Sequence, residues 1–497
     1  MAGIAGQVDE LAARLHAAGV RGGERVAFYR SYSFDTVLLA CATARLGAVP
    51  ALLSHRVDGP TATGLLHQLD RPRLVTDRAM VAGELAGTGW AELVTGPPIA
   101  TDRPPADLPD DLPGAVDLAG LAGGDRPPPV RPDPEEPALI THTSGTTDVP
   151  KLCIQSARSL YWQVPQQARL LRIVCYGREE MVQCVSMLHA RMYSGLALYA
   201  SLGIPAVYLA DPDPDRVARV LADRRPGGLE SHPNILIRWE RLAGHPEQPL
   251  RSVKLFINGF DAVHPRTVRT LLAASRRAYP VYALGYGQTE IGLVTGKLFT
   301  RRSAQRADFR CVGRPFSPLT RVRVAPVDGH RPSPARPGYI EARSDGRSLT
   351  YVAQEQRHAA QRQPGGWWRM GDLGYRTWFG CVHLLDREID HGTGVDSNLA
   401  VEDRLLAGLD QLVEAVLVAG DGRPVPVVST RDDQPLDLAA WHRVTASLPP
   451  LAPPLQVRWA DIPVTSTWKI RRPELLRRIR AGELTSIEPA AGAPDGR

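Results

Sequence analysis

The sequence predicts an α/β fold, in which a large N-terminal domain of doubly wound sheets with a β-rich subdomain precedes a small α+β domain. At 497 residues the chain is too long for one hydrophobic core. Strand-like and amphipathic helical segments alternate over most of its length, as is typical of doubly wound sheets. Past about residue 310 short strands separated by turns replace this alternation, and the segment after residue 387 is long enough for a compact module.

The first elements alternate between helix and strand. Val8–Ala18 has helical spacing, with its apolar residues on one face, and nearby glycines end it. Arg25–Tyr29 is predicted as a buried strand, Phe34–Leu46 as a second amphipathic helix and Ala48–Leu53 as the next strand. Residues 103–137 are rich in Pro, Asp and Gly, which predicts a long surface connection.

The alternation resumes at Ala138 and continues to about residue 284. Predicted strands lie within Leu198–Leu209, Ser252–Asn258 and Pro280–Leu284, and predicted helices at Asp215–Arg224 and His264–Ala278. The β-rich subdomain is predicted from short strands at 322–326, 338–343 and 381–385, and the small domain from a helix at 401–412 and a strand at 413–418. We expect domains at residues 1–387 and 388–482 and a disordered tail at 483–497.

Composition and charge exclude several classes of function. The net charge of +6 is spread along the chain, without the basic blocks and interleaved aromatics of nucleic-acid-binding proteins. The six cysteines show no Cys-x-x-Cys pair or metal-ligand spacing, and are predicted to be buried hydrophobes in a reducing compartment. The N-terminus lacks a signal peptide, and the longest apolar stretch, Thr36–Leu53, is interrupted by Arg45 and Pro50. We expect a soluble, cytoplasmic protein that binds neither nucleic acid nor membrane.

Lysine is rare in this chain. Four of the 59 basic residues are lysines, at positions 151, 254, 297 and 469. Because arginine dominates, a remaining lysine indicates a position that favours a compact point charge with freely rotating donors. Lys151 and Lys469 each lie in a Ser/Thr-rich stretch, which predicts that two distant segments converge on one anionic ligand.

The run Thr143–Lys151 is a candidate phosphate-binding loop. Gly145 allows a close approach of the backbone, the hydroxyl and amide groups can donate to phosphoryl oxygens, and Lys151 adds charge. Its spacing differs from that of the Gly-x-x-x-x-Gly-Lys-Ser/Thr nucleotide loop. The alternative is a Ser/Thr-rich turn that happens to contain one lysine.

Three shorter stretches are further candidates. Tyr286–Glu290 follows a predicted strand, where Thr289 can donate to a phosphate and Glu290 can hold Mg²⁺; the alternative is a glycine turn with a solvated glutamate. Asp372 lies between two glycines, and a tight turn there would suit a contact to ribose hydroxyls, although an Asx-turn is the commoner role. Asp386–Arg387 is either a hinge with a phosphate-facing arginine or a surface ion pair. His142, His232 and His264 are interpreted as structural or capping residues.

Together, in this order, the motifs resemble those of the adenylate-forming superfamily, which comprises acyl-CoA synthetases, non-ribosomal peptide adenylation domains and luciferases. The resemblance extends from Ala12 to about Arg478. Its landmarks are Thr143–Thr147, Leu188–His189 with Gly195, Tyr286–Glu290, Cys311–Pro315, Pro337–Glu341, Gly371–Asp372, Arg387 and Pro463–Ile470.

The resemblance implies that ATP and Mg²⁺ are the cofactors. It implies cofactor-binding roles for Thr143, Ser144, Gly145, Thr146, Thr147, Lys151, Gly259, Phe260, Asp261, Tyr286, Gly287, Gln288, Asp372 and Arg387. It implies catalytic roles for Thr289 at the α-phosphate, Glu290 as the Mg²⁺ ligand, His189 at the acyl pocket, and Lys469 on a mobile small domain. Lys469 would stabilise charge while a carboxylate attacks the α-phosphate.

The chain departs from the family pattern at several positions. Asp148 and Leu152 stand where glycines are frequent, and Trp468 stands where glycine usually precedes the lysine. In the hairpin that positions the thiol acceptor, the family has a basic residue, a glycine, a proline and a glutamate, and a gapless reading here gives Thr393, Asp396, Val401 and Asp403. An aspartate in place of the hairpin glycine argues against a close approach of pantetheine.

We therefore expect an AMP-forming ligase that activates an aryl or acyl carboxylic acid as acyl-AMP, releases pyrophosphate and transfers the acyl group in bacterial specialised metabolism. The expected acceptor is CoA, a carrier-protein thiol or an amine. One alternative is amide-bond synthesis or activation of an unusual oxyacid such as nitrite, as a diazotase would require. An alternative of another class is a nucleotide-binding protein with a catalytically decayed site.

Overall fold

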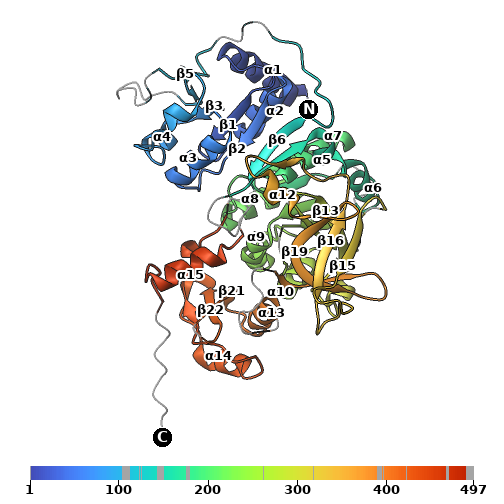
Figure 1. Ribbon diagram of the computed structural model, residues 1–497. Coiled ribbons are helices and arrows are strands. Elements are labelled where there is room, and N and C mark those ends of the chain that lie inside the picture. The colour runs from blue at the N-terminus through green and yellow to red at the C-terminus, as the bar shows by residue number, and fades with distance from the viewer. Residues whose placement is uncertain are drawn as a thin grey trace.

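The computed structural model describes residues 2–102, 112, 114–121, 124, 126–142, 150–174, 179–260, 262–316, 318–388, 395, 397–420, 422–465 and 469–487. Within these ranges the strands form an eight-stranded, a twelve-stranded and a three-stranded sheet. Figure 1 shows the first sheet in blue and cyan beside the second in green to orange, with the small sheet in red. The predicted α/β class is thereby confirmed.

The first sheet has the strand order β17-β7-β6-β2-β1-β3-β4-β5. Its strands are β1 (Arg25–Tyr29), β2 (Val49–Leu52), β3 (Arg73–Thr76), β4 (Ile99–Ala100), β5 (Val116–Asp117), β6 (Pro137–His142), β7 (Leu152–Ser156) and β17 (Thr350–Tyr351). Alternate residues of β1 enter opposite cores: Val26 and Phe28 pack with α1 (Ala2–Ala17) and α2 (Asp35–Arg45), and Ala27 and Tyr29 with α3 (Gly59–Gln68). The sheet is therefore covered on both faces, as a doubly wound sheet requires.

The second sheet has the order β15-β16-β19-β20-β14-β13-β12-β11-β10-β8-β9, and β18 (Arg362–Gln363) pairs with β19. Its parallel part comprises β8 (Met181–Cys184), β9 (Ala206–Tyr208), β10 (Gly228–Ser231), β11 (Leu255–Asn258) and β12 (Val281–Gln288). The antiparallel part comprises β13 (Gly292–Thr300), β14 (Cys311–Pro315), β15 (Arg321–Ala325), β16 (Gly338–Arg343), β19 (Trp367–Arg376) and β20 (Val382–Arg387). The change of direction thus comes at the β12–β13 turn, earlier than the predicted change near residue 310.

Helices cover the parallel part on both faces. One face packs against α8 (Pro214–Arg224) and α10 (Pro265–Ala274), and the other against α6 (Val164–Val174) and α7 (Ala190–Leu202). The shorter helices are α4 (Arg78–Ala82), α5 (Ala157–Tyr161), α9 (Pro233–Arg238), α11 (Arg301–Ala304) and α12 (Glu355–Ala359). None of the helices in the described ranges is long and apolar enough to cross a membrane.

The last elements form a small module around the third sheet. Its strands are β21 (Leu412–Val418), β22 (Val425–Thr430) and β23 (Leu455–Gln456), and its helices are α13 (Asn398–Gly408), α14 (Leu438–Thr445) and α15 (Arg472–Arg480). Alternate residues of β21 again enter two cores, Leu417 beside α13 and α14, and Val416 and Val418 beside α15. The module lies against α9 and α10 of the large part (Figure 1). The domain boundary at residue 387 stays a prediction, as does the tail, since residues 488–497 are outside the described ranges.

Candidate active site

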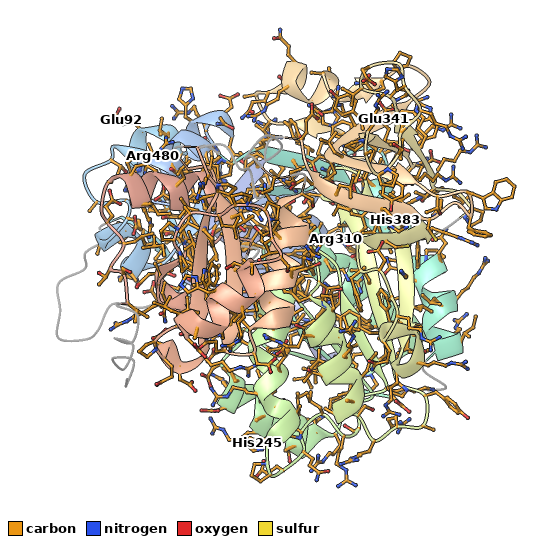
Figure 2. All side chains as sticks on the ribbon, turned by 90° about the horizontal axis from the view of Figure 1, so that it is seen from below. Glu92, His245, Arg310, Glu341, His383 and Arg480 are labelled. Atoms are coloured by element: carbon orange, nitrogen blue, oxygen red, sulfur yellow. The ribbon has the colours of Figure 1, made fainter. Side chains whose placement is uncertain are left out.

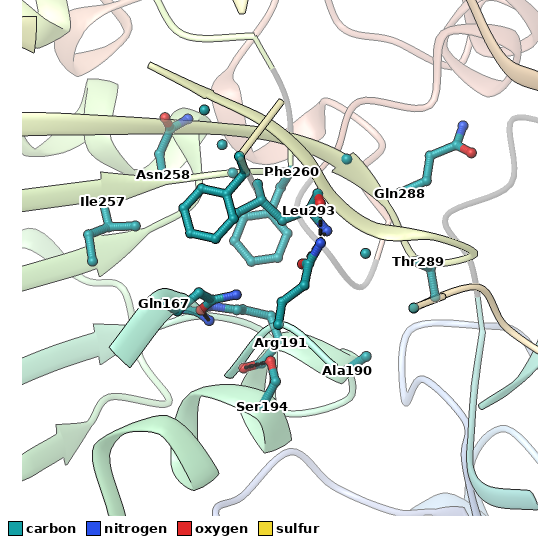
Figure 3. A pocket seen from close by; sticks show the side chains of 18 of the residues that line it. Gln167, Ala190, Arg191, Ser194, Ile257, Asn258, Phe260, Gln288, Thr289 and Leu293 are labelled. Atoms are coloured by element: carbon teal, nitrogen blue, oxygen red, sulfur yellow. Dashed lines mark hydrogen bonds between the residues drawn. The ribbon is translucent and has the colours of Figure 1, made fainter. Parts of the chain in front are cut away.

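Two adjoining cavities lie at the carboxyl ends of the parallel strands of the second sheet, where ligands bind in open α/β sheets. The larger has a volume of about 580 Å³ and the smaller about 90 Å³. The residues that border both are Phe260, Leu284, Gly285, Gly287, Arg387 and Lys469. Figure 3 looks into the larger cavity, with Phe260 near its centre and Gln167, Arg191 and Ser194 on the side of α6 and α7.

The structure gathers many of the residues predicted from the sequence at these cavities. The larger is bordered by Lys151, His189, Gly259, Phe260, Gly287, Gln288, Thr289, Glu290, Arg387 and Lys469, and the smaller also by Tyr286 and Asp372. The predicted residues Thr143, Ser144, Gly145, Thr146, Thr147 and Asp261 lie outside the described residues, as do Asp148, Asp396 and Trp468. The individual roles of all these residues stay predictions.

Asp372 is fixed on the wall of the smaller cavity. It lies in β19 opposite Arg387 of β20, and its side chain is buried. One carboxylate oxygen accepts a hydrogen bond from the Tyr286 hydroxyl at 2.7 Å, and the other lies 3.7 Å from the Arg387 guanidinium. Burial and then the Asp372 carboxylate hold the pKa of Tyr286 well above its ordinary value, so this hydroxyl remains a donor. The fixed carboxylate is suited to accept bonds from the two hydroxyls of a ribose.

The predicted tight turn around Asp372 is wrong. The residue lies in the middle of β19, and Gly371 adopts a left-handed φ of +73° beside an irregularity in the strand register. A Cβ on Gly374 would come within 2.1 Å of the His383 carbonyl oxygen of β20. The two glycines therefore allow a distorted strand and a close approach of its neighbour, and the chain does not reverse there.

Positive charge surrounds Lys151 at the other end of the larger cavity. The Lys151 ammonium lies 5.0 Å from the centre of the Tyr351 ring. Burial lowers the pKa of Lys151, and the Glu290 carboxylate opposes that shift. The charges of Arg357 and Arg387 lower this pKa further, which places them near Lys151 as well. Such a cluster favours an anionic ligand.

Glu290 presents an oriented carboxylate to the larger cavity. It follows β12 in the turn to β13, and its Oε1 accepts a hydrogen bond from the Tyr351 hydroxyl at 2.5 Å. Of the described residues, no group of three or more His, Cys, Asp or Glu could hold a metal. Mg²⁺ usually takes one or two carboxylates together with substrate phosphates and water, so a single oriented carboxylate on this wall fits Mg²⁺-ATP.

Lys469 is carried by the small module and reaches both cavities. It lies next to a β-bridge between Val464 and Ile470, and its amide donates to the Thr465 hydroxyl at 3.1 Å. Its charge is the second cause, after burial, of the lowered pKa of His189. Lys151 and Lys469 both border the larger cavity, and their convergence on one anionic ligand stays a prediction.

His189 is a neutral hydrogen-bond donor in this cavity. It caps α7, and its Nδ1 accepts the backbone N–H of Arg191 at 3.0 Å, so the ring proton is on Nε2. Nε2 lies 3.4 Å from the Thr289 hydroxyl. Burial and the charge of Lys469 lower the pKa of His189 to about 3, so it stays neutral near pH 7. This arrangement suits a donor to a substrate oxygen rather than a general base.

Phe260 forms a partition between the two cavities. Its backbone has a φ of +81°, which is uncommon for a residue with a side chain and typical of functional sites. The ring contacts His189 edge-on at 5.1 Å and His232 at 4.0 Å between centroids. His232 also accepts the Ser186 amide at 3.1 Å, which agrees with a structural role.

A buried polar network forms the wall beneath the larger cavity. Glu230 of β10 is 2% exposed and accepts from Arg191 at 2.6 and 3.0 Å and from the Tyr199 hydroxyl at 2.8 Å. Arg191 also donates to Gln167 of α6 at 2.6 Å. Burial would lower the pKa of Arg191, but the Glu230 carboxylate outweighs it and keeps the guanidinium charged. The wall is therefore polar and internally neutral.

Gln288 has structural contacts in addition to its place at the cavity, and one other interpretation, that of Asp403, needed correction. Gln288 borders the larger cavity, but its amide accepts from Trp368 at 3.1 Å and donates to the Met370 carbonyl, which ties β12 to β19. Asp403, read as part of the acceptor hairpin, lies in α13, where it pairs with Arg310 and, at 3.1 Å, with His264.

The sequence analysis missed Glu230, Arg191 and Tyr351. Glu230 had a usable signal, because it is a single charge within the buried stretch Gly228–Ser231. Arg191 follows His189 by two residues and could have been paired with that charge. Tyr351 comes to Glu290 only through the pairing of β17 with β7, which no local pattern reports.

Comparison with known proteins places the chain in a family. Residues 4–352 match the family described as AMP-binding enzyme. The chain is 46% identical to 3-amino-2-hydroxy-4-methoxybenzoate diazotase of Streptomyces cremeus, over 97% of this chain and 90% of that protein. It is 26% identical to an indoleacetate–CoA ligase of Aromatoleum aromaticum, over 84% of this chain and 83% of that protein. An anthranilate CoA ligase in complex with anthranoyl-AMP superposes with a TM-score of 0.80 at 15% identity, covering 97% of this chain and 92% of that one.

The fold, the cavities and these similarities agree with one another. The cofactors are ATP and Mg²⁺, and the reaction is of the AMP-forming ligase type, in which an acid is activated as its adenylate and pyrophosphate is released. The chain thus belongs to the AMP-binding enzyme family of adenylate-forming ligases.

Proposed function

We propose that this enzyme activates nitrite with Mg²⁺-ATP and transfers the nitroso group to the amino group of an aromatic acid bound in the larger cavity. The observation that carries the proposal is the 46% identity to a diazotase of an aminohydroxybenzoate, which spans nearly the whole of both chains. A second relative, 3-aminoavenalumate diazotase of a Streptomyces species, is 25% identical over 96% of this chain. Both names describe the conversion of an aromatic amine to a diazonium group.

The larger cavity supports an aromatic substrate with polar substituents. Its volume of about 580 Å³ lies within the range of small-molecule sites, about 300–1,000 Å³. Apolar residues and amides share its lining: Leu160, Leu171, Leu198, Leu255, Ile257 and Leu293, with Gln155, Gln163, Gln166 and Gln167. Amides and the neutral Glu230–Arg191 pair can bond ring hydroxyl, amino and carboxylate groups, which a long alkyl chain would leave without partners.

The proposed reaction takes place in two steps beside Thr289 and Lys469, which both border the larger cavity. A nitrite oxygen attacks the α-phosphorus, an O–P bond forms, and pyrophosphate leaves. The ring amine then attacks the nitroso nitrogen, and AMP leaves with its electron pair. Proton transfer and loss of water from the N-nitroso product give the diazonium ion. An aromatic amine is uncharged near neutral pH, because its lone pair is delocalised into the ring, so the neutral His189 need not act as a base.

A second candidate is activation of the aromatic carboxylate itself, with CoA as acceptor. Relatives that are ligases of aromatic acids to CoA favour it, including 2-hydroxy-7-methoxy-5-methyl-1-naphthoate–CoA ligase of Streptomyces carzinostaticus at 25% identity. The same cavity would then present the carboxylate, rather than the amine, to the α-phosphate. A carrier-protein thiol or another amine would be alternative acceptors in this reading.

One experiment separates the candidates. Exchange of labelled pyrophosphate into ATP is measured with nitrite alone, with aminohydroxybenzoates alone and with both, and products with and without CoA are identified by mass. We expect exchange with nitrite and a diazonium product, trapped by a phenol, only when the aromatic amine is present. Exchange with the aromatic acid alone, and a thioester with CoA, would support the second candidate instead. ATP binding without exchange in any condition would indicate a decayed site.

A further inference from the structure

A cluster of titratable side chains lies outside both cavities, on the antiparallel part of the second sheet. Cys311 of β14 stands directly opposite His383 of β20 in the strand register, which brings their side chains side by side on one face of the sheet. The Nδ1 atom of His383 lies 2.9 Å from the Asp308 carboxylate. The Lys297 ammonium of β13 donates to the Asp308 carbonyl at 3.1 Å, and the Tyr375 ring stacks on His383 at 4.7 Å. A thiol next to an imidazole that a carboxylate orients is the arrangement of an activated nucleophile.

The charges in this cluster agree with that geometry. Burial would raise the pKa of Cys311, but the bonds from His383 and Lys297 outweigh it and lower the value to about 6. The nearby Asp308 carboxylate and Cys311 sulfur raise the pKa of His383 to about 9, and both shifts favour the thiolate and imidazolium forms of the pair. Burial acts alone at Cys41, whose pKa is raised to about 11.

Cys311 borders neither cavity, but its neighbours do. Arg310 and Val312, on either side of it, both border the smaller cavity. Arg310 also bonds the Leu399 carbonyl at 3.0 Å and pairs with Asp403, which ties β14 to α13 of the small module. Figure 2 marks Arg310 and His383 on this face of the molecule. Cys311 itself does not reach the smaller cavity, so a group attached to it would act by displacing the backbone that carries Arg310 and Val312.

We propose that Cys311 is a site of reversible thiolation, at which a small disulfide reacts and thereby lowers the activity of the enzyme. The thiolate attacks one sulfur of the disulfide, a new S–S bond forms to Cys311, and the other sulfur leaves as a thiolate. The imidazolium of His383 holds the attacking charge in place. Because only 5% of the Cys311 surface is exposed, the reagent must be small.

The first test follows the rate of modification against pH. The full-length protein is treated with methyl methanethiosulfonate between pH 5.5 and 8.5, and each cysteine peptide is quantified by mass spectrometry. Between pH 7 and pH 8.5 the rate at Cys311 should rise less than about twofold, whereas an ordinary thiol with a pKa of about 8.5 should rise about 15-fold. Cys381, half-buried and directly before β20, is the internal comparison. A rate at Cys311 that rises as steeply as that of an ordinary thiol would overturn the proposal.

The second test connects the modification to activity. Treatment should lower the rate of ATP–pyrophosphate exchange, and dithiothreitol should restore it. Cys311→Ser should keep the untreated rate and resist the reagent. His383→Gln, which keeps the thiol, should restore the steep pH profile at Cys311, and this provides the test if Cys311→Ser does not fold. Equal inhibition of Cys311→Ser and wild type would refute the proposed control of activity, and an unchanged pH profile in His383→Gln would refute the assigned activation.

Discussion

The side chain of Arg266 joins the large part of the protein to the small module through three hydrogen bonds. From α10 it donates to the carbonyl oxygens of Leu406, Leu409 and Leu412 at 3.0, 3.3 and 2.7 Å, at the end of α13 and the start of β21. It also pairs with Glu240 at 3.0 Å. We predict that Arg266→Met loosens the small module while leaving the large part folded.

The size of the effect follows from these bonds. Bonds to a charged group contribute about 1.5–3 kcal/mol each, but bonds from one side chain are not additive. Glu240 keeps Arg431 at 3.0 Å and the Thr267 hydroxyl at 2.6 Å, so the substitution does not leave a buried charge without partners. The loss is therefore about 3 kcal/mol, at the lower end of the range for breaking buried pairs. Opening of α13 should then become about 100-fold more frequent.

Amide hydrogen exchange of α13 measures this opening directly. Arg269→Met is the matched control, because Arg269 lies on the same helix and donates within the large part, to the Ala304 carbonyl at 2.9 Å. We expect faster exchange in α13 and β21 for Arg266→Met, little change there for Arg269→Met, and unchanged protection of β1 in both. Equal exchange of α13 in the two variants would refute the role assigned to Arg266.

Three further predictions concern the site and its attachment. Lys469→Ala should lower the rate of adenylate formation about 100-fold or more, with little change in ATP affinity. A loss of this size corresponds to the about 2.7–4 kcal/mol that a donor acting on the transition state contributes. In steady-state assays, a Lys469→Ala rate above about a tenth of the wild-type rate would contradict this role. Tyr351→Phe removes the donor that orients Glu290. The Mg²⁺ concentration for half-maximal activity, and the Mn²⁺ concentration for half-saturation in a binding assay with ATP, should therefore rise about tenfold or more. An unchanged Mn²⁺ affinity would exclude this role. Burial opposes the charges of His264 and Asp403, but their attraction raises the pKa of His264 and lowers that of Asp403. Their pairing therefore stabilises fully between about pH 4 and 6.5, and the stabilisation is lost as pH rises through the raised pKa or falls through the lowered one. His264→Gln should flatten the thermal stability between pH 6 and 9, and an unaltered profile would show that this pair does not set it.

Local patterns in the sequence predicted the elements that depend on local order. Arg25–Tyr29 was predicted as a strand and is β1 with the same bounds, because a short apolar run that follows a glycine-rich turn has few alternatives. The helix predicted at Val8–Ala18 is α1, which begins at Ala2 because weakly apolar residues continue its face. The rarity of lysine and the Ser/Thr-rich stretches around Lys151 and Lys469 predicted that these two segments come together, and both lysines border the larger cavity.

Features that depend on pairing between distant strands could not be predicted in this way. Glycines on both sides of Asp372 resemble those of a turn, and only the proximity of the His383 carbonyl explains their presence in a strand. The contact of Tyr351 with Glu290 and the position of Cys311 opposite His383 likewise arise from register between strands far apart in the chain. The residue type alone does not identify which of many possible partners a tyrosine or a cysteine contacts.

The position of Phe260 has a consequence for how the two substrates bind. Its ring is a wall of both cavities and is backed by His189 and His232, so it cannot move away from one cavity without entering the other. An aromatic substrate large enough to displace the ring must therefore change its own affinity and that of ATP by the same factor, because coupling between two binding equilibria is reciprocal. The affinity for a substituted aromatic ring would then depend on whether ATP is bound. A bulky analogue should compete with the substrate more weakly when ATP is saturating than when ATP is absent.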